Sequence, residues 1–220
     1  MDSKEISKTV IARLPRYYRY LGDLKDKGVE RISSKELSLL MRVTASQIRQ
    51  DLNNFGGFGQ QGYGYNVDYL CEEIGKILGL NRTHNLIICG AGHLGAALAG
   101  NGSFAHRGFI IKGLFDVDEE KIGKSVHGIN VYSMDAFDYF VGGHDIDIAV
   151  IAVPKEAAKE LAERIVSSNI RAIWNFSNTE LNVPDDVIVE NVHLLDSLMR
   201  LSYDIDSYTG SKEPGENGEE

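Results

Sequence analysis

Apolar residues recur at helical spacing over the first 27 residues, and they predict a helix over residues 4–27 that Gly28 ends. They form one stripe, made of Ile6, Val10, Leu14, Tyr18, Leu21 and Leu24. We expect Pro15 to kink this helix or to begin a second segment, because proline has no N–H to donate. The other face carries Lys8, Arg13, Arg16, Tyr17, Arg19 and Tyr20. Solvent contact and phosphate contact suit this face equally well.

Two short amphipathic helices separated by a brief turn come next, which predicts a helix-turn-helix. Ser33 with Glu36, and Thr44 with Gln47, have the spacing of a capping box and so begin the two helices. The second helix is expected to end near Phe55. The predicted core positions are Leu37, Leu40, Met41, Ile48 and Leu52. The predicted exposed positions of the second helix are Ser46, Gln47, Arg49, Gln50 and Asn53. These side chains can bond base edges and phosphates, so we predict that this helix reads DNA.

Five glycines interleaved with aromatic residues over 56–65 predict a β-hairpin, since its turn needs positive φ. A hairpin that directly follows a recognition helix is the wing of a winged-helix domain, and Gln60 and Gln61 lie at its expected tip. A flexible linker is the alternative, but linkers seldom contain large apolar groups such as Phe58 and Tyr63. Residues 66–79 return to a helical pattern with Asn66 as N-cap, and residues 81–84 form a plausible boundary.

A dinucleotide-binding pattern begins after this boundary. The apolar run 85–89 is followed at once by the glycine loop 90–95, of the form G-x-G-x-x-G, and then by a helix. Gly90 would permit the tight turn, Gly92 would let the backbone approach a pyrophosphate, and Gly95 would pack the helix on the strand. The next strand, 109–115, ends in Asp116, whose carboxylate would accept hydrogen bonds from the adenosine ribose. Because a carboxylate repels a 2′-phosphate, the sequence favours NAD(H) over NADP(H).

The remaining pattern alternates strands and helices, as in a doubly wound α/β sheet. Strands are predicted over 129–132, 146–153, 172–175 and 187–192, and helices over 133–142, 154–168 and 194–205. Ligands bind at the carboxyl edge of such a sheet. The residues predicted to contact the dinucleotide are therefore Gly90, Ala91, Gly92, His93, Leu94, Gly95, Asp116, Val153, Pro154 and Asn175. The last helix has an apolar stripe, made of Leu195, Leu198, Leu201 and Ile205, that needs a partner surface.

The charge of the chain is divided unevenly. The net charge of the 220 residues is −9, but residues 1–55 hold 11 Lys/Arg against 7 Asp/Glu, whereas residues 81–220 hold 11 against 22. This asymmetry suggests a polyanion partner for the first part. Two cysteines are too few for a disulfide framework or a zinc site, and the six histidines have no metal spacing. With no apolar run long enough to span a membrane, we expect a cytoplasmic protein.

Together the motifs resemble the bacterial redox-sensing repressor family Rex over residues 8–206. The resemblance rests on the segments 13–18 (RLPRYY), 33–37 (SSKEL), 47–52 (QIRQDL), 55–65, 90–95 (GAGHLG) and 115–118 (FDVD). The resemblance implies a homodimer that binds operator DNA and leaves it when NADH binds. It also implies that the C-terminal helix crosses to the partner subunit. This chain departs from many members at Gln60 and Gln61, where they have Lys or Arg, and at His193, where they have Asp.

The sequence thus predicts an α/β protein of two domains that binds NAD(H) as a regulatory ligand. It predicts no catalytic residues. The predicted parts are a winged helix-turn-helix domain over 1–80, a Rossmann domain over 81–192, a dimerisation helix over 193–207 and a disordered acidic tail over 208–220. The predicted DNA contacts are Arg13, Arg16, Tyr17, Ser46, Gln47, Arg49, Gln50, Asn53, Gln60 and Gln61. A small NAD(H)-dependent oxidoreductase and a coenzyme A binding module are the alternatives.

Overall fold

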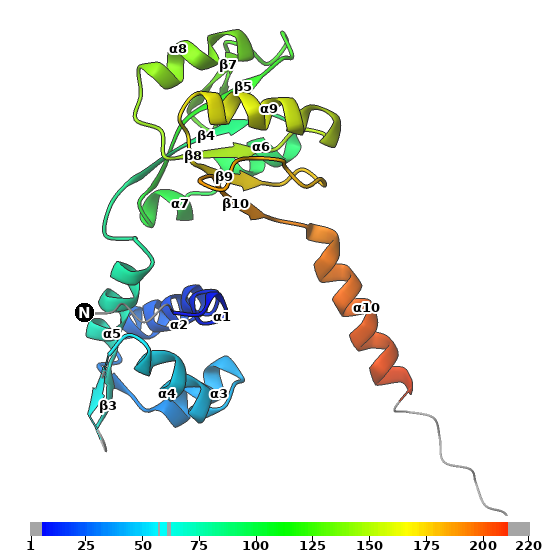
Figure 1. Ribbon diagram of the computed structural model, residues 1–220. Helices are drawn as coiled ribbons and strands as arrows, with labels where there is room; N and C mark the ends of the chain where they lie inside the picture. Colours follow the sequence, from blue (N-terminus) through cyan, green and yellow to red (C-terminus); the bar gives the residue numbers. More distant parts are fainter. Residues whose placement is uncertain (1–5, 57, 61–62, 211–220) are drawn as a thin grey trace, which may run out of the picture. The chain divides into compact units, whose positions relative to one another are not determined.

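The computed structural model describes residues 6–56, 58–60 and 63–210. It divides into two compact units, Met1–Arg82 and Thr83–Glu220, which are described separately (Figure 1). Gln61 at the predicted wing tip and the predicted disordered tail from residue 211 lie outside the described residues.

The first unit is helical with a small sheet. Its elements are α1 (Lys8–Ile11), α2 (Leu14–Asp26), β1 (Arg31–Ile32), α3 (Ser34–Met41), α4 (Ala45–Asn53), β2 (Gly59–Gln60), β3 (Gly64–Asn66) and α5 (Val67–Ile77). The three short strands pair antiparallel in the order β1-β3-β2. The helix-turn-helix and the following hairpin are therefore present as predicted, and β1 is an additional strand that completes the wing sheet.

The first helix is not continuous, which confirms the expectation that Pro15 begins a second segment. The helix is interrupted at Ala12 and Arg13. Pro15 lies in the first turn of α2, where a backbone N–H would have no partner within the helix, so proline loses no helical hydrogen bond there. Within α2, Tyr17 follows the buried Leu14 by three residues and precedes the buried Leu21 by four, so Tyr17 is buried at 1% exposure and Tyr18 is only partly buried. The prediction that Tyr17 lies on the exposed face is wrong for this reason.

The predicted helix starts hold at Ser33 and only in part at Thr44. Ser33 Oγ accepts from the Glu36 N–H at 3.1 Å while the Glu36 carboxylate accepts from the Ser33 N–H at 2.8 Å, which is a full capping box. Thr44 Oγ1 accepts from the Gln47 N–H at 3.1 Å. The Gln47 side chain does not return the bond, because it turns toward Asp51 instead.

The core of the first unit lies between α2, α3, α4 and α5. Its fully buried members include Leu14, Leu21, Leu37, Ile48, Leu52, Leu70 and Ile74. One position predicted to face inward is more open, because Leu40 is 45% exposed; Ile77, in the last turn of α5, is 37% exposed. Helix α4 ends at Asn53 rather than at Phe55.

The second unit contains a seven-stranded sheet in the order β10-β9-β8-β4-β5-β7-β6 (Figure 1). Its strands are β4 (His84–Cys89), β5 (Phe109–Asp116), β6 (Ser125–Val126), β7 (Ile129–Ser133), β8 (Ile148–Ile151), β9 (Ala172–Asn175) and β10 (Ile188–Asn191). Six strands are parallel, and β6 pairs antiparallel with β7. This is the doubly wound α/β sheet that the sequence predicts.

Helices pack on both faces of this sheet. They are α6 (His93–Ala99), α7 (Ser103–His106), the 3-10 turn η1 (Met134–Ala136), α8 (Phe137–Gly142) and α9 (Lys155–Ser167). Helices α8 and α9 cover one face with Phe137, Ala158 and Ile165, whereas α6 contributes Ala99 to the core of the other face. The short elements α7 and β6 have too few residues to show a periodic pattern, and they were not predicted.

The last helix, α10 (Leu194–Gly210), extends to Gly210 rather than to Ile205. Residues 208–210, which were assigned to the disordered tail, are therefore helical. Every described side chain of α10 from Leu194 to Tyr208 is exposed, including Leu195 at 55%, Leu198 at 61% and Ile205 at 54%. Among the described residues, the side chains of Leu195, Leu198 and Leu201 are therefore each more than half exposed.

Candidate functional site

The exposed face of α4 is the first candidate site. Ser46, Arg49, Gln50 and Asn53 are all exposed, as predicted for a helix that reads DNA. The Arg49 guanidinium donates to Ser34 Oγ at 3.0 Å, which links α4 to the first turn of α3. A polar, cationic helix face of this kind can place hydrogen-bond donors against base edges in a major groove.

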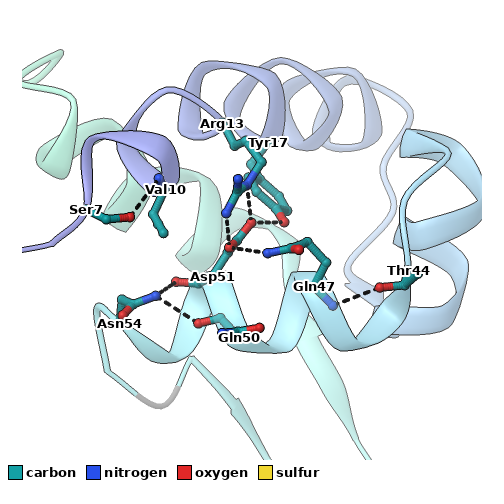
Figure 2. Close-up of polar contacts among 9 residues, drawn as sticks. All are labelled: Ser7, Val10, Arg13, Tyr17, Thr44, Gln47, Gln50, Asp51 and Asn54. Atoms are coloured by element: carbon teal, nitrogen blue, oxygen red, sulfur yellow. Dashed lines mark hydrogen bonds and ion pairs between the residues drawn. The ribbon is translucent and has the colours of Figure 1, made fainter.

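Three residues that were predicted to contact DNA instead converge on Asp51, a buried residue of α4 (Figure 2). The Arg13 guanidinium donates two hydrogen bonds to its carboxylate, at 2.7 and 2.6 Å. The Tyr17 hydroxyl donates at 3.0 Å and the Gln47 amide donates at 2.8 Å. The Asp51 side chain is 1% exposed and that of Arg13 is 32% exposed. Arg13, Tyr17 and Gln47 therefore fix α4 against α2. Tyr17 is too deeply buried for its predicted DNA contact, whereas the DNA contacts of Arg13 and Gln47 stay predictions.

The electrostatics of this cluster follow from its geometry. Burial alone would raise the pKa of Asp51, but the hydrogen bonds from Arg13, Gln47 and Tyr17 lower it by more, so the pKa lies below its usual value. Burial and the bond to the carboxylate raise the pKa of Tyr17. The carboxylate is therefore ionised and fully paired at neutral pH, which is the condition under which a buried charge is tolerated.

The other predicted DNA contacts lie at the edges of this face. Arg16 is exposed, but its guanidinium also donates to the carbonyl of Met41 and lies 5.9 Å from the ring centre of Tyr20. Gln60 lies in β2, paired with Gly64 of β3. Next to the part of the wing outside the described residues, Tyr63 is 70% exposed.

The glycine loop after β4 is the second candidate site, and each glycine has a distinct geometric reason. Gly90 has φ of +105°, and a Cβ there would lie 2.4 Å from the carbonyl oxygen of Ala152. A Cβ on Gly95 would lie 1.8 Å from the carbonyl oxygen of Gly90, so only glycine lets α6 pack this closely. A Cβ on Gly92 would meet nothing within 4 Å, which leaves space for a ligand above the loop. The roles of Gly90 and Gly95 agree with the sequence predictions, whereas the approach of a pyrophosphate to Gly92 stays a prediction.

Asp116 lies at the end of β5, beside this loop. Its carboxylate accepts from the Ala91 N–H at 2.8 Å, from the Asp118 N–H at 3.0 Å and from the Lys121 ammonium at 3.3 Å. Burial pushes the pKa of Asp116 upward, but the backbone bonds and Lys121 outweigh it, so the pKa is lowered. Ala91 therefore uses its N–H to orient Asp116, and Asp116 is held as an anion at the position expected of a ribose acceptor.

A cavity of about 500 Å³ opens between the glycine loop and the strand ends. Among its lining residues are Gly90, Gly92, Phe115, Asp116, Val117, Lys121, Met134, Val153, Pro154 and Arg164. The predicted contacts Val153 and Pro154 thus share one cavity with the loop and with Asp116. His93 and Leu94 form the first turn of α6, where His93 is exposed. This arrangement can hold the adenosine and pyrophosphate parts of a dinucleotide.

Asn175, the last predicted contact, is not available to a ligand. It is 0% exposed at the end of β9. Its amide donates to the Thr179 carbonyl at 2.9 Å and to Asn191 Oδ1 at 2.7 Å. Its Oδ1 accepts from the N–H and the hydroxyl of Ser177 at 3.0 and 2.5 Å. A primary amide has two N–H donors and two acceptor lone pairs, and protein partners use all four. The prediction that Asn175 contacts the cofactor is therefore corrected.

Sequence reasoning missed two functional residues for which a signal existed. Asp51 is three residues after Ile48 and one before Leu52, so its position on the buried helix face already required a cationic partner. Lys121 follows Asp116 by five residues in an acidic turn, and it contacts both Asp116 and Asp118, at 3.3 and 3.1 Å. Val117, 80% exposed beside Asp116, had no distinguishing pattern in the sequence.

Other chemistry is not assembled among the described residues. Those residues contain no group of three or more His, Cys, Asp or Glu side chains that could hold a metal ion. In the same part of the chain, none of the helices has the length and hydrophobicity that a membrane span requires. Both cysteines are buried and unpaired, and burial raises the pKa of Cys89 to about 12.

Comparison with known families divides the chain in the same place as the structure. A family described as "Putative DNA-binding protein N-terminus" matches residues 5–53. A family described as "CoA binding domain" matches residues 81–179.

Curated relatives match nearly the whole chain. A redox-sensing transcriptional repressor Rex of Clostridioides difficile (strain 630) is 54% identical over 203 residues, which cover 92% of this chain and 97% of the relative. The protein of the same name from Thermoanaerobacter pseudethanolicus is 54% identical over 199 residues, which cover 90% of this chain and 89% of the relative.

Solved structures agree with these relatives. RSP in complex with β-NAD⁺ and operator DNA is 52% identical and has a TM-score of 0.88, covering 94% of this chain and 95% of its own. RSP in complex with β-NADH is 48% identical and has a TM-score of 0.87, and the match covers 95% of this chain and 98% of the RSP chain. A further structure of RSP is described as a Rex-family repressor, at 50% identity and a TM-score of 0.86.

Proposed function

This chain belongs to the Rex family of redox-sensing transcriptional repressors, and from that premise we propose that it binds operator DNA and leaves it when NADH binds. The N-terminal unit reads the operator, and the C-terminal unit binds NAD(H) as a regulatory ligand. A rising NADH/NAD⁺ ratio thereby relieves repression. A repressor of this kind works in the cytoplasm, where both the DNA and the dinucleotide pool are found.

The exposed face of α4 carries the proposed DNA contact. Ser46, Arg49, Gln50 and Asn53 supply donors and acceptors for base edges, while Arg16 and the wing contact the phosphates. Arg13, Tyr17 and Gln47 support this contact indirectly by holding α4 on α2. The excess of basic residues in the first 55 residues favours association with a polyanion.

The geometry of the glycine loop and Asp116 carries the proposed NAD(H) site, and it is the single observation on which the regulatory function depends. The pyrophosphate lies over Gly92, where the structure leaves open space, and the amides at the start of α6 face it. The anionic Asp116 accepts hydrogen bonds from the adenosine ribose and disfavours a 2′-phosphate. Val153 and Pro154 border the same cavity.

A homodimer is proposed because one chain leaves two apolar surfaces uncovered. Leu195, Leu198 and Leu201 of helix α10 are each more than half exposed, and the sheet carries a second, apolar cavity of about 410 Å³ lined by residues such as Phe104, Trp174 and Ile188. Large exposed apolar surfaces mark interaction sites. A second copy of the chain would cover the helix and would also supply the second DNA-binding domain that a two-fold operator requires.

A binding selection tests this function. The full-length protein is incubated with a pool of duplexes that carry randomised inverted repeats, and the enriched duplex is then titrated by fluorescence anisotropy with NAD⁺, NADH and coenzyme A. We expect NADH to release the duplex at concentrations at which NAD⁺ and coenzyme A do not. Release by coenzyme A alone would favour a coenzyme A module instead. Steady consumption of NADH with simple aldehydes or ketones would favour an oxidoreductase.

A further inference from the structure

A row of backbone hydrogen bonds runs along the carboxyl edge of the sheet, just past the strand ends. The Gly90 N–H donates to the Phe115 carbonyl at 2.7 Å, and the Ala152 N–H donates to the Cys89 carbonyl at 2.8 Å. The row continues beyond β8. There the Phe176 N–H donates to the Ile151 carbonyl at 2.9 Å, and the Val192 N–H donates to the Asn175 carbonyl at 2.8 Å. It therefore joins the glycine loop to the residue that lies two positions before α10.

Asn175 adds a side-chain tie at the end of this row nearest to α10. Its amide bonds Asn191 Oδ1 at 2.7 Å, and Asn175 and Asn191 are register partners in the parallel pair of β9 and β10. The Asn191 amide in turn donates to Glu180 Oε2 at 3.4 Å, and His193 Nε2 lies 3.7 Å from Glu180 Oε1. His193 immediately precedes α10.

These contacts make the ends of β9 and β10 move together. The buried Asn175 amide is saturated, so a displacement of β9 at this edge must displace Asn191 as well or leave a buried hydrogen-bonding group without its partner, which is unfavourable. The cavity above the loop is bordered by Ala152 and Val153, which directly follow β8. A ligand in this cavity would therefore contact residues that belong to, or adjoin, the same row of bonds.

We propose that Asn175 and Asn191 form a positioning clamp that transmits the state of the dinucleotide cavity to helix α10. The clamp contacts no ligand. It fixes the direction in which the chain leaves β10, and hence the placement of α10 in the dimer. This inference rests on the proposed function, because it assigns the coupling step between NADH binding and operator release to these two residues.

The test measures coupling separately from binding. For full-length protein, the coupling factor is the operator Kd at saturating NADH divided by the operator Kd without NADH. The variant Asn191→Ala removes the acceptor for Asn175 but leaves the backbone row and the Thr179 bond in place. We expect its coupling factor to fall by about tenfold, within the usual range for coupling between sites. The NADH Kd of the DNA-free variant should stay close to that of the unmodified protein.

Two further variants keep the test falsifiable. Asn191→Asp retains an oxygen acceptor for the Asn175 amide and should restore most of the coupling. Asn182→Ala, at an exposed asparagine of the preceding loop, is the matched control and should leave coupling unchanged. Unchanged coupling in Asn191→Ala would overturn the clamp, and so would a loss of NADH affinity as large as the loss of coupling. If the unmodified protein itself shows no release by NADH, the proposed function fails and the clamp fails with it.

Discussion

Removal of the Asp51 carboxylate should destabilise the DNA-binding unit and leave the stability of the second unit unchanged. Deleting one partner of a buried ion pair costs roughly 3–5 kcal/mol, because the other charge is left without compensation. Arg13 is 32% exposed and can regain water, which lowers this cost, whereas the buried Tyr17 hydroxyl loses its acceptor, which raises it. We therefore expect Asp51→Ala to lower the free energy of unfolding of this unit by about 3 kcal/mol.

Two observables separate the units in the intact chain. Hydrogen exchange of the backbone amides of α2 and α4 reports on the first unit. Fluorescence of Trp174, the single tryptophan of the chain, reports on the second. Asp51→Ala should accelerate exchange in α2 and α4 toward that of the unfolded chain, while the denaturant midpoint of Trp174 fluorescence should not move.

Matched variants identify the cause of the loss. In the same unit, Lys25 and Asp68 form an ion pair at 3.1 Å with both side chains more than half exposed, so Asp68→Ala should cost less than about 1 kcal/mol. The double variant Arg13→Met with Asp51→Leu replaces the buried pair by apolar groups and should recover most of the stability. If the double variant were as unstable as Asp51→Ala, uncompensated charge could not explain the loss, and the reasoning would be refuted.

Three further predictions concern pH and ligand binding. Because the folded pKa of Asp51 is depressed, its stabilising contribution is complete above the unfolded pKa of about 3.9 and is lost as the pH falls through the lower folded value. Exchange protection of α4 should therefore fall below about pH 4, more steeply in the unmodified protein than in Asp51→Ala. Arg49→Ala should weaken operator binding by roughly 1–3 kcal/mol in anisotropy titrations, and an equal loss on non-specific duplex would contradict base readout. Asp116→Ser should weaken NADH binding and free Lys121 to pair with a 2′-phosphate, so that fluorescence titration detects a gain in NADPH affinity. That gain should vanish when Lys121→Gln is added, and its persistence would count against Lys121.

The sequence predicted the two domains and the sheet because their signals are local and periodic. The glycine loop, its preceding strand and Asp116 all lie between residues 84 and 116, and Gly90 and Gly95 have steric reasons that hold in any such loop. Ser33 and Glu36 formed their capping box because the first turn of α3 offers that pair no other partner.

The errors lie where a side chain chooses between a local and a distant partner. Gln47 has the spacing to cap its own helix, but the buried Asp51 offers a charged acceptor one turn later. Asn175 lies at a strand end where ligand contacts are expected, but its amide bonds Thr179 in the following loop and Asn191 in the neighbouring strand. No short sequence pattern reveals these two partners. Tyr17 is buried because it shares a face of α2 with Leu14 and Leu21, and its hydroxyl finds the distant partner Asp51.

Because α10 is exposed in a single chain, the concentration of the protein affects how much of it is dimeric. An association that covers the helix is bimolecular, so its extent depends on total protein concentration by mass action. At low concentration more of the chain is monomeric, and its apolar stripe stays in contact with water. The thermal midpoint should then rise with protein concentration. The cellular amount of the protein would therefore set, together with the dinucleotide ratio, how far its target genes are silenced.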